Sequence, residues 1–502
     1  MPSHMPAAAI LTNTLYMCLL LLPFQPACAG DDWPQFRGPN CRGVANADSK
    51  LPVHFSSTEN VRWKVTPGDG IGGACVAEGR VFVSGMKDAG TVQLMALDLL
   101  SGNLLWQREW AVEDLAEIHE TNSHASSTPA ADKQHVYFYF TKLGLLALDA
   151  ATGKDAWQFP IPEPFFVFKW GAGVSPVLYN DLVLFCQDDD LNPALYAIRK
   201  SDGQLAWKDN RIDMAVNYSH PVINTVNGVD EIVVAGTGMV IGYDPASGRR
   251  NWFARGLLRN IKTTPVSVDG TIYISLQSSG IANQWLVAID QADTGNHDGR
   301  IDEQETQAYF GSRPIPPQFF ERTFKRGDSN NDGFLEGAEL DAAFLHPDNF
   351  AGASFQNLGE KAADEYILAV RGGGHGDVSD SHVLWRHSTK HTDHVVSPIV
   401  TNEQLLLLKS GGICTVFDLK GGQMQGGPKR VGNAANFFAS PVSGGGHLYF
   451  AGENGTVTVL KDTPSLNQLA INDLGESIVA TPAIAGNAIL FRTRGTLYCI
   501  SD

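Results

Sequence analysis

The sequence predicts an all-β protein, an eight-bladed β-propeller closed by its N-terminal strand, with a small α-helical insertion in blade five. Three observations predict this fold. A hairpin phrase recurs with a fixed spacing, a proline-containing phrase recurs about every 44 residues, and the two ends of the chain complement each other. One step between the prolines is 133 residues long, which indicates the insertion.

The hairpin phrase consists of an apolar strand, a turn with Gly, and a Trp. It reads "MALDLLSGNLLW", "LALDAATGKDAW", "YAIRKSDGQLAW" and "IGYDPASGRRNW". In each copy the Trp follows eight positions after the residue that ends the first strand, as Trp106 follows Asp98. Alternating apolar positions around such a turn are typical of a β-hairpin.

The second phrase marks the start of each unit. Its prolines are Pro129, Pro176, Pro221, Pro265, Pro398, Pro441 and Pro482, and all steps except the long one measure 41 to 47 residues. A unit of this length forms four short strands, which is one propeller blade. Proline is tolerated at the start of a strand because no ladder N–H is lost there.

The chain ends complete one blade together. The C-terminal "GTLYCISD" lacks a following Trp strand, and the N-terminal "NVRWKV" supplies one with Trp63. Counting the unit that starts near Gly73 gives eight blades. Closure by the N-terminal strand removes the open sheet edges that would invite aggregation.

The first 29 residues resemble a secretory signal. Leu15 to Phe24 form a short apolar core, and Ala27 to Ala29 form a cleavage site of small residues. A lipid anchor on Cys28 is the alternative. We therefore expect a secreted or periplasmic protein. The net charge of −17 argues against nucleic acid or an anionic membrane as partner, and no other run is long enough for a transmembrane segment.

The expected organisation has five parts. These are a signal peptide (1–29), an N-terminal segment (30–58), the first part of the propeller (59–290), the insertion (291–361) and the rest of the propeller (362–502). The phrase "WLVAID" ends at Asp290, and its partner Trp385 follows 95 residues later. This spacing places the insertion between strands three and four of blade five, on the face opposite the links between blades. We expect a monomer.

The insertion contains a complete calcium loop, "DSNNDGFLEGAE". A twelve-residue EF-hand loop supplies oxygen ligands from positions 1, 3, 5, 7, 9 and 12, with Gly at position 6. The sequence has Gly333 at position 6 and Leu335 at the apolar position that pairs with a sister loop. The candidate calcium ligands are Asp328, Asn330, Asp332, the Phe334 carbonyl, Glu336 and Glu339. Calcium is the expected cofactor.

A weaker sister loop precedes it. Anchored on Gly299, it places Thr294 at position 1, with Asp293 one residue too early, and Ile301 at the pairing position. Its candidate ligands are Asp293, Asn296, Asp298, the Arg300 carbonyl, Asp302 and Glu305. A thirteen-residue loop that uses Asp293, and a structural half-site that never fills, are both open.

The links between blades should ring one mouth of the propeller channel. They carry the candidate ligand residues His124, Trp170, His220, Lys262, His394 and Phe437. Such residues can bind a small ligand or merely fill the channel.

Five histidines between His375 and His394 suggest a metal site, but they fall on a loop, a strand and a link, and a zinc site needs converging ligands.

The repeats and the opening "DWPQFRGPNCRGV" (Asp32–Val44) resemble the PQQ-like β-propeller family, over roughly residues 32–502. This family includes quinone-dependent dehydrogenases and the outer-membrane assembly protein BamB, and the opening resembles its extracytoplasmic bacterial branch. The dehydrogenases often hold the quinone against adjacent cysteines, which this chain lacks. The resemblance therefore implies a non-catalytic platform for an unknown protein or small-molecule ligand, without PQQ. The alternative is an enzyme, quinoprotein-like or other, with a pocket at the channel mouth.

Overall fold

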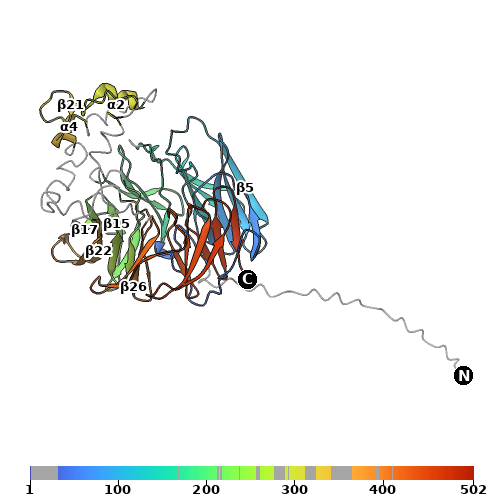
Figure 1. Ribbon diagram of the computed structural model, residues 1–502. Coiled ribbons are helices and arrows are strands. Elements are labelled where there is room, and N and C mark those ends of the chain that lie inside the picture. Colours follow the sequence, from blue (N-terminus) through green and yellow to red (C-terminus); the bar gives the residue numbers. More distant parts are fainter. Residues whose placement is uncertain are drawn as a thin grey trace.

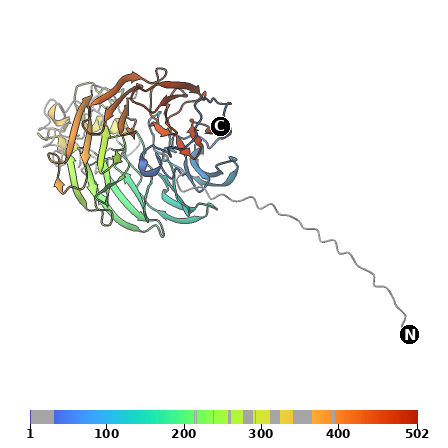
Figure 2. The ribbon, with the colours of Figure 1, turned by 90° about the horizontal axis from the view of Figure 1, so that it is seen from below.

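The fold is an eight-bladed β-propeller in the computed structural model of the chain. Apart from Met1, the structure describes residues 32–166, 169–211, 214, 217–236, 238–255, 261–275, 289–291, 293–310, 324–340, 365–389, 395–409 and 411–502. The expected signal peptide and Cys28 lie outside these residues. The strands of the blades form eight sheets of four antiparallel strands, and one of these sheets gains a fifth, short strand. Figure 1 shows the blades from the side, and Figure 2 shows them following one another in a ring.

The first four blades follow one another without interruption along the chain. Blade one contains β2 (Cys75–Ala77), β3 (Arg80–Asp88), β4 (Thr91–Asp98) and β5 (Leu104–Ala111). Blade two contains β6 (Ala130–Ala131), β7 (His135–Phe140), β8 (Gly144–Asp149) and β9 (Asp155–Phe159). Blade three contains β10 (Val177–Tyr179), β11 (Leu182–Gln187), β12 (Ala194–Arg199) and β13 (Leu205–Asn210). Blade four contains β14 (Val222–Val226), β15 (Val229–Gly236), β16 (Met239–Tyr243) and β17 (Arg250–Arg255).

The remaining blades contain the insertion and the closure of the ring. Blade five contains β18 (Val266–Val268), β19 (Thr271–Ser275), β22 (Glu365–Arg371) and β24 (Val383–Thr389). Blade six contains β25 (Ile399–Thr401), β26 (Gln404–Leu408), β27 (Ile413–Asp418) and β28 (Met424–Arg430). Blade seven contains β29 (Val442–Gly444), β30 (His447–Ala451), β31 (Thr456–Lys461) and β32 (Gln468–Asp473). Blade eight contains β33 (Ala483–Ala485), β34 (Ala488–Arg492), β35 (Leu497–Ile500) and β1 (Val61–Val65).

The N-terminal strand closes the ring as the sequence predicts. In blade eight, β1 pairs antiparallel with β35, and Trp63 lies opposite Cys499. The indole Nε1 of Trp63 also donates to the carbonyl oxygen of Leu99 in blade one, at 2.9 Å. Backbone pairing thus joins the N-terminal strand to blade eight, and one buried indole joins blade eight to blade one.

The recurring Gly and Trp hold neighbouring blades together. A Cβ on Gly102 would lie 2.5 Å from the Trp63 ring, so only glycine fits beneath that indole. Gly102 also has a φ of +69°, which favours glycine independently of the contact. The same packing recurs between Trp106 and Gly153, Trp157 and Gly203, Trp207 and Gly248, and Trp385 and Gly422. The spacing in the hairpin phrase thus reflects packing between consecutive blades.

The N-terminal segment, with η1 (Pro39–Cys41), crosses one end of the channel. The carbonyl of Pro34 accepts a hydrogen bond from Ala131 of blade two. The side chain of Asn40 pairs with the backbone of Ile223 in blade four, and Gly43 accepts from Ser443 of blade seven. A segment that reaches blades on different sides of the ring covers that end of the channel.

The predicted position of the insertion within blade five is wrong. β22 pairs with β19 on one side and with β24 on the other, where Trp385 lies opposite Ala369. The third strand is therefore β22, and the phrase that ends at Asp290 does not supply it. The insertion joins strands two and three, and antiparallel geometry places that link on the same face as the links between blades.

The described part of the insertion is small. It contains β20 (Ile301–Asp302), α2 (Glu303–Phe310), α4 (Lys325–Gly327) and β21 (Phe334–Leu335). α2, α4 and β21 lie beyond the blades at the top of Figure 1. Residues 311–323 and 341–364 of the expected α-helical insertion lie outside the described residues. A further strand, β23 (Gly376–Asp377), joins blade five to β17 of blade four by parallel pairing.

Candidate functional site

The loop from Asp328 to Glu339 folds around its acidic side chains. Asp328, Asp332 and Glu339 each place a carboxylate oxygen within 4.8 Å of the others. Oδ2 of Asp328 accepts the backbone N–H of Gly333 at 3.0 Å, and Oδ1 of Asn330 accepts the N–H of Asp332 at 2.8 Å. These bonds orient the oxygens toward the centre of the loop.

Glu339 carries the feature that best fits a cation. Its side chain is 9 % exposed, and Oε1 accepts hydrogen bonds from Ser329 at 2.8 and 3.0 Å. Oε2 is buried and has no hydrogen-bond partner among the described residues. A buried carboxylate oxygen without a partner is costly. A hard cation that takes six to eight oxygens would complete its coordination.

The other two expected ligands of this loop differ in setting. Glu336 is exposed, and its carboxylate lies 3.9 Å from Nε of Arg300 in the neighbouring loop. Phe334 would contribute only its backbone carbonyl, and its ring lies under the Arg300 guanidinium at 4.1 Å. Both residues thus take part in contacts between the two loops.

The two loops are paired through a short antiparallel sheet. Ile301 in β20 lies opposite Leu335 in β21, and both side chains are fully buried. The sequence predicts this pairing from the equivalent positions of the two residues. Paired loops of this kind are the usual arrangement of EF-hands, which the sequence also predicts.

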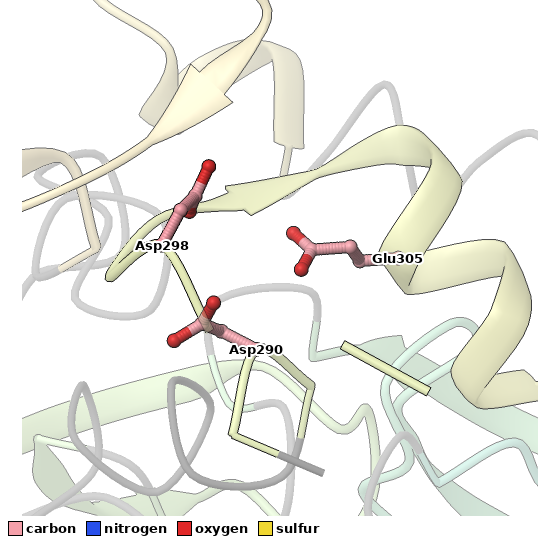
Figure 3. A group of neighbouring side chains, drawn as sticks. All are labelled: Asp290, Asp298 and Glu305. Carbon is pink, nitrogen blue, oxygen red and sulfur yellow. The ribbon is translucent and has the colours of Figure 1, made fainter. Parts of the chain in front are cut away.

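The first loop departs from its predicted ligand set. Asp298 and Glu305 converge, but the third carboxylate is Asp290 rather than Asp293, and Asp293 is exposed. Figure 3 shows Glu305 reaching from α2 toward the turns that carry Asp290 and Asp298. Asp290 does not belong to the predicted ligand set because a twelve-residue template starts after it.

The remaining candidates of the first loop have local roles. Oδ1 of Asn296 accepts the N–H of Asp298 at 2.8 Å. Oδ1 of Asp302 accepts the N–H of Glu305 at 2.7 Å, and Oε2 of Glu305 lies 3.2 Å from the N–H of Asp302. This reciprocal pair is a capping box at the start of α2. Arg300 contributes its backbone to the turn, and its N–H donates to Asp298 at 2.9 Å.

A cavity of about 230 Å³ occupies the channel mouth. Three of the expected residues, Trp170, His220 and Lys262, line it. His124 lies instead in a much smaller neighbouring pocket with Glu163. Phe437 is buried in the core, and its neighbour Phe438 lines the cavity. His394 lies outside the described residues.

A ring of hydrogen bonds beneath this cavity was not expected from the sequence. In most blades the residue before the recurring proline is Ser or Thr. Its side-chain oxygen accepts the backbone N–H of the equivalent residue in the preceding blade, at 2.8 to 3.4 Å. In chain order the members are Gly73, Thr128, Ser175, His220, Thr264, Ser397, Ser440 and Thr481. The signal was present in "STPA", "VSPV" and "TTPV".

His220 takes the place of a hydroxyl in this ring. Its Nε2 accepts the N–H of Ser175 at 3.0 Å, and its Nδ1 lies 3.0 Å from Oγ1 of Thr264. Phe36 of the N-terminal segment stacks on the imidazole, with ring centroids 4.3 Å apart. Burial, with a smaller contribution from Arg37, lowers the pKa of His220 to about 3. The imidazole is therefore neutral at physiological pH, with both nitrogens engaged.

The insertion contacts the rim of this cavity. Tyr309 of α2 packs under the ammonium of Lys169, 5.0 Å from its ring centroid. Lys169 in turn pairs with Glu117 at 3.0 Å, and the next residue, Trp170, lies under Lys262 at 5.0 Å. This contact confirms that the insertion lies on the channel-mouth face. The predicted placement on the opposite face is wrong because the insertion leaves blade five one strand earlier than expected.

The histidines between His375 and His394, which the sequence does not favour as a metal site, engage separate partners where the structure describes such contacts. Nδ1 of His382 lies 2.8 Å from the Ser381 hydroxyl, and the His387 ring packs on Phe417 with centroids 4.9 Å apart. Among the described residues, the groups able to hold a metal ion are the two acidic clusters of the insertion. His391 and His394 lie outside the described residues.

No helix among the described residues is long and apolar enough to cross a membrane.

Two curated relatives are both called outer membrane protein assembly factor BamB. The one from Yersinia pestis is 25 % identical over 241 residues, covering 45 % of this chain and 57 % of the relative. The one from Moranella endobia (strain PCIT) is 24 % identical over 213 residues, covering 40 % and 51 %. The chain thus spans about half the length of these relatives.

A solved structure of BamB from Moraxella catarrhalis aligns with a TM-score of 0.50 and 10 % identity, covering 88 % of this chain and 99 % of that one. At this identity the likeness shows the fold alone. A family model described as outer membrane protein assembly factor BamB matches residues 45–166 and 168–320, more than half of the 502 residues. The chain therefore belongs to the BamB-like family of β-propellers.

Proposed function

We propose that this protein is a non-catalytic, extracytoplasmic platform that binds another protein through its channel-mouth face. Its insertion binds one calcium ion in the loop from Asp328 to Glu339. Family membership supports the platform, because the relatives are named as assembly factors. Only protein binding is carried over from the relatives to this chain, because one fold hosts many functions.

The ring beneath the cavity supports a non-catalytic role. General base catalysis needs a group with a free proton acceptor and a pKa near the working pH. The two nitrogens of His220 are engaged by Ser175 and Thr264, and its pKa lies far below neutrality. His220, which lines the cavity at the channel mouth, therefore serves to join blades three, four and five.

The calcium proposal depends on the buried Oε2 of Glu339, which has no hydrogen-bond partner among the described residues. Asp328 and Asp332 add two carboxylates beside it. Three acidic groups that converge without a cation repel one another. A calcium ion removes that repulsion and ties the two ends of the loop together.

Site-specific crosslinking tests the platform. A photo-crosslinking residue at exposed Glu120, in the link between blades one and two, should capture a protein partner in the native cell envelope. The matched control is exposed Glu78, in the turn between β2 and β3, which antiparallel geometry places on the other face. Equal capture at both positions would contradict a platform on the mouth face.

A small-ligand site is the second candidate function, and the cavity of about 230 Å³ supports it. Trp170 and Tyr218 offer aromatic surfaces there, and Lys262 offers a cation. Native mass spectrometry of the protein purified from its host tests this candidate. A bound mass that disappears in Trp170→Ala favours a ligand site or an enzyme, and an unmodified mass favours the protein platform.

A further inference from the structure

Asp290 is a buried acid that the proposed calcium loop does not use. Its side chain is 1 % exposed, and Oδ1 is buried without a hydrogen-bond partner among the described residues. Oδ2 receives only a long contact, 3.3 Å, from the N–H of Gly299. A carboxylate buried in this way requires a compensating positive charge or a proton.

Two more carboxylates converge on the same point. Asp298 and Glu305 each place an oxygen within 4.8 Å of the others and of Asp290. Glu305 is 5 % exposed, and its Oε1 accepts the N–H of Asn296 at 2.7 Å. Two of the three acids are therefore removed from water and lie close to one another (Figure 3).

The arrangement reproduces that of the second loop, residue for residue, except at its start. Gly299 donates to Asp290 as Gly333 donates to Asp328. Glu305 accepts a backbone N–H early in its loop, as Glu339 does. Asp290 and Glu305 are 15 positions apart, whereas Asp328 and Glu339 are 11 apart. The first loop thus has four extra residues between its first and last acids.

We propose that this loop is a second calcium site, in which Asp290, Asp298 and Glu305 are the carboxylate ligands and Asp290 replaces Asp293. Oδ1 of Asp290, in the first acid of one loop, and Oε2 of Glu339, in the last acid of the other, are both buried without a partner among the described residues and give one candidate oxygen in each loop. Three carboxylates suit a hard divalent cation, and the long loop with its local bonds favours Ca²⁺ over the rigid octahedral Mg²⁺.

One contact competes with the ion. Oδ2 of Asp298 lies 3.2 Å from the Arg300 guanidinium, and Arg300 also approaches Glu336 of the second loop. Ion binding requires Asp298 to share or release this contact. The first site should therefore be the weaker of the two, because ligand charge tunes affinity in such loops.

Isothermal titration of metal-stripped, full-length protein with CaCl₂ tests the proposal. The wild type should bind two ions, and Asp290→Asn should bind one, or should weaken one site by at least about tenfold. Asn retains an oxygen that can accept from Gly299, so the local fold is preserved. Asp293→Asn is the matched control, because it removes an equal charge three residues away and should still bind two ions.

The variants separate this site from the one at Asp328. Glu339→Gln should remove or weaken the other ion and leave the Asp290 site. The wild type could instead bind one ion that is lost in Glu339→Gln but kept in Asp290→Asn. This result would overturn the site at Asp290 and leave the proposed function intact. If the wild type binds a single ion that is lost only in Asp290→Asn, the calcium site in the loop from Asp328 to Glu339 would be overturned instead. Equal loss in Asp290→Asn and Asp293→Asn would mean that only net charge matters, which also contradicts the site.

Anomalous diffraction gives an answer that does not depend on stability. Crystals grown with CaCl₂ should show a peak between Asp290, Asp298 and Glu305. A peak at the Asp328 loop without one here contradicts the proposal.

Discussion

The backbone N–H of Ser175 donates to Nε2 of His220 across the boundary between blades three and four. Equivalent bonds to Ser or Thr hydroxyls connect the other consecutive blades from blade one to blade eight. A histidine has thus replaced a hydroxyl without breaking the ring. The substitution keeps an acceptor at the same place, and Phe36 covers the larger ring that results.

His220→Ala should lower the free energy of unfolding by about 1–3 kcal/mol, because it leaves the buried N–H of Ser175 without an acceptor. His220→Thr follows the pattern of the other blades and should cost less. Urea unfolding of both variants measures the difference. Equal losses in the two variants would mean that ring packing, rather than the hydrogen bond, sets the cost.

The lowered pKa of His220 predicts a dependence of stability on pH. Its pKa is about 3 in the folded protein and about 6.5 in an unfolded chain. Below 6.5 the unfolded state binds the proton and the folded state does not, so stability falls as pH falls from 6.5 to about 3. Unfolding free energies measured between pH 4 and 7 should show a smaller slope in His220→Thr than in the wild type. An unchanged slope would assign the effect to other groups.

Closure of the ring predicts a large cost for losing Trp63. The side chain is 9 % exposed and packs on Gly102 of blade one. Trp63→Ala should destabilise the propeller by about 3–5 kcal/mol, and deletion of residues 59–68 should also reduce solubility. The control Leu104→Ala alters a side chain that is 52 % exposed and should change stability by less than about 0.5 kcal/mol. Thermal unfolding of both variants measures these losses, and a small loss in Trp63→Ala would contradict the role of Trp63 in closing the ring.

The contact between Tyr309 and Lys169 predicts that the insertion protects the channel rim. Burial, with a smaller contribution from Glu117, raises the pKa of Tyr309. Tyr309→Ala should increase hydrogen exchange in the link from residue 160 to 166 and leave exchange in blade seven unchanged. Mass spectrometry of peptides from both regions provides the measurement and its control. Unchanged exchange at the rim would show that the contact between Tyr309 and Lys169 contributes little to the protection of the rim.

The sequence predicted the blades well because each of them repeats the same local physics. Alternating strands, a turn glycine and a tryptophan are visible in four uninterrupted copies, and the recurring prolines mark the further blades, so number, order and closure could be derived. The insertion was misplaced because "WLVAID" mimics a third strand, while the true one, β22 with "EYILAVR", follows 90 residues after β19. Only pairing in three dimensions distinguishes these two candidates.

The candidate site was predictable where it follows a fixed template. The loop from Asp328 to Glu339 has standard spacing, and its carboxylates converge. Asp290 lies four residues before the start that the template gives, so no spacing rule identifies it. The hydroxyl ring was missed because Ser and Thr before proline are common at strand starts, and their partners lie on other blades.

The last prediction is that calcium in the loop from Asp328 to Glu339 stabilises the insertion and does not act as a switch. Sensor EF-hands expose a Met-rich groove when they open, and this chain has no Met between Asp290 and Lys361. Calcium at 100 times the dissociation constant should stabilise the insertion by about 2.7 kcal/mol. Sites in extracellular modules bind at roughly 10⁻⁴ to 10⁻³ M, so outside the cytoplasm this one would stay largely filled.

Glu339→Gln should abolish the calcium-dependent part of the melting transition, because it weakens the bidentate grip on the ion, and should leave the propeller's own transition nearly unchanged. The matched control is Glu336→Gln, which removes the same charge from an exposed side chain and should reduce the shift only in part. Calorimetry with calcium and with a chelator measures both variants. A wild type whose transition does not respond to calcium would contradict the site. Calcium-driven binding of an apolar dye would instead identify a sensor, because it would reveal the opening that a stabilising ion does not cause.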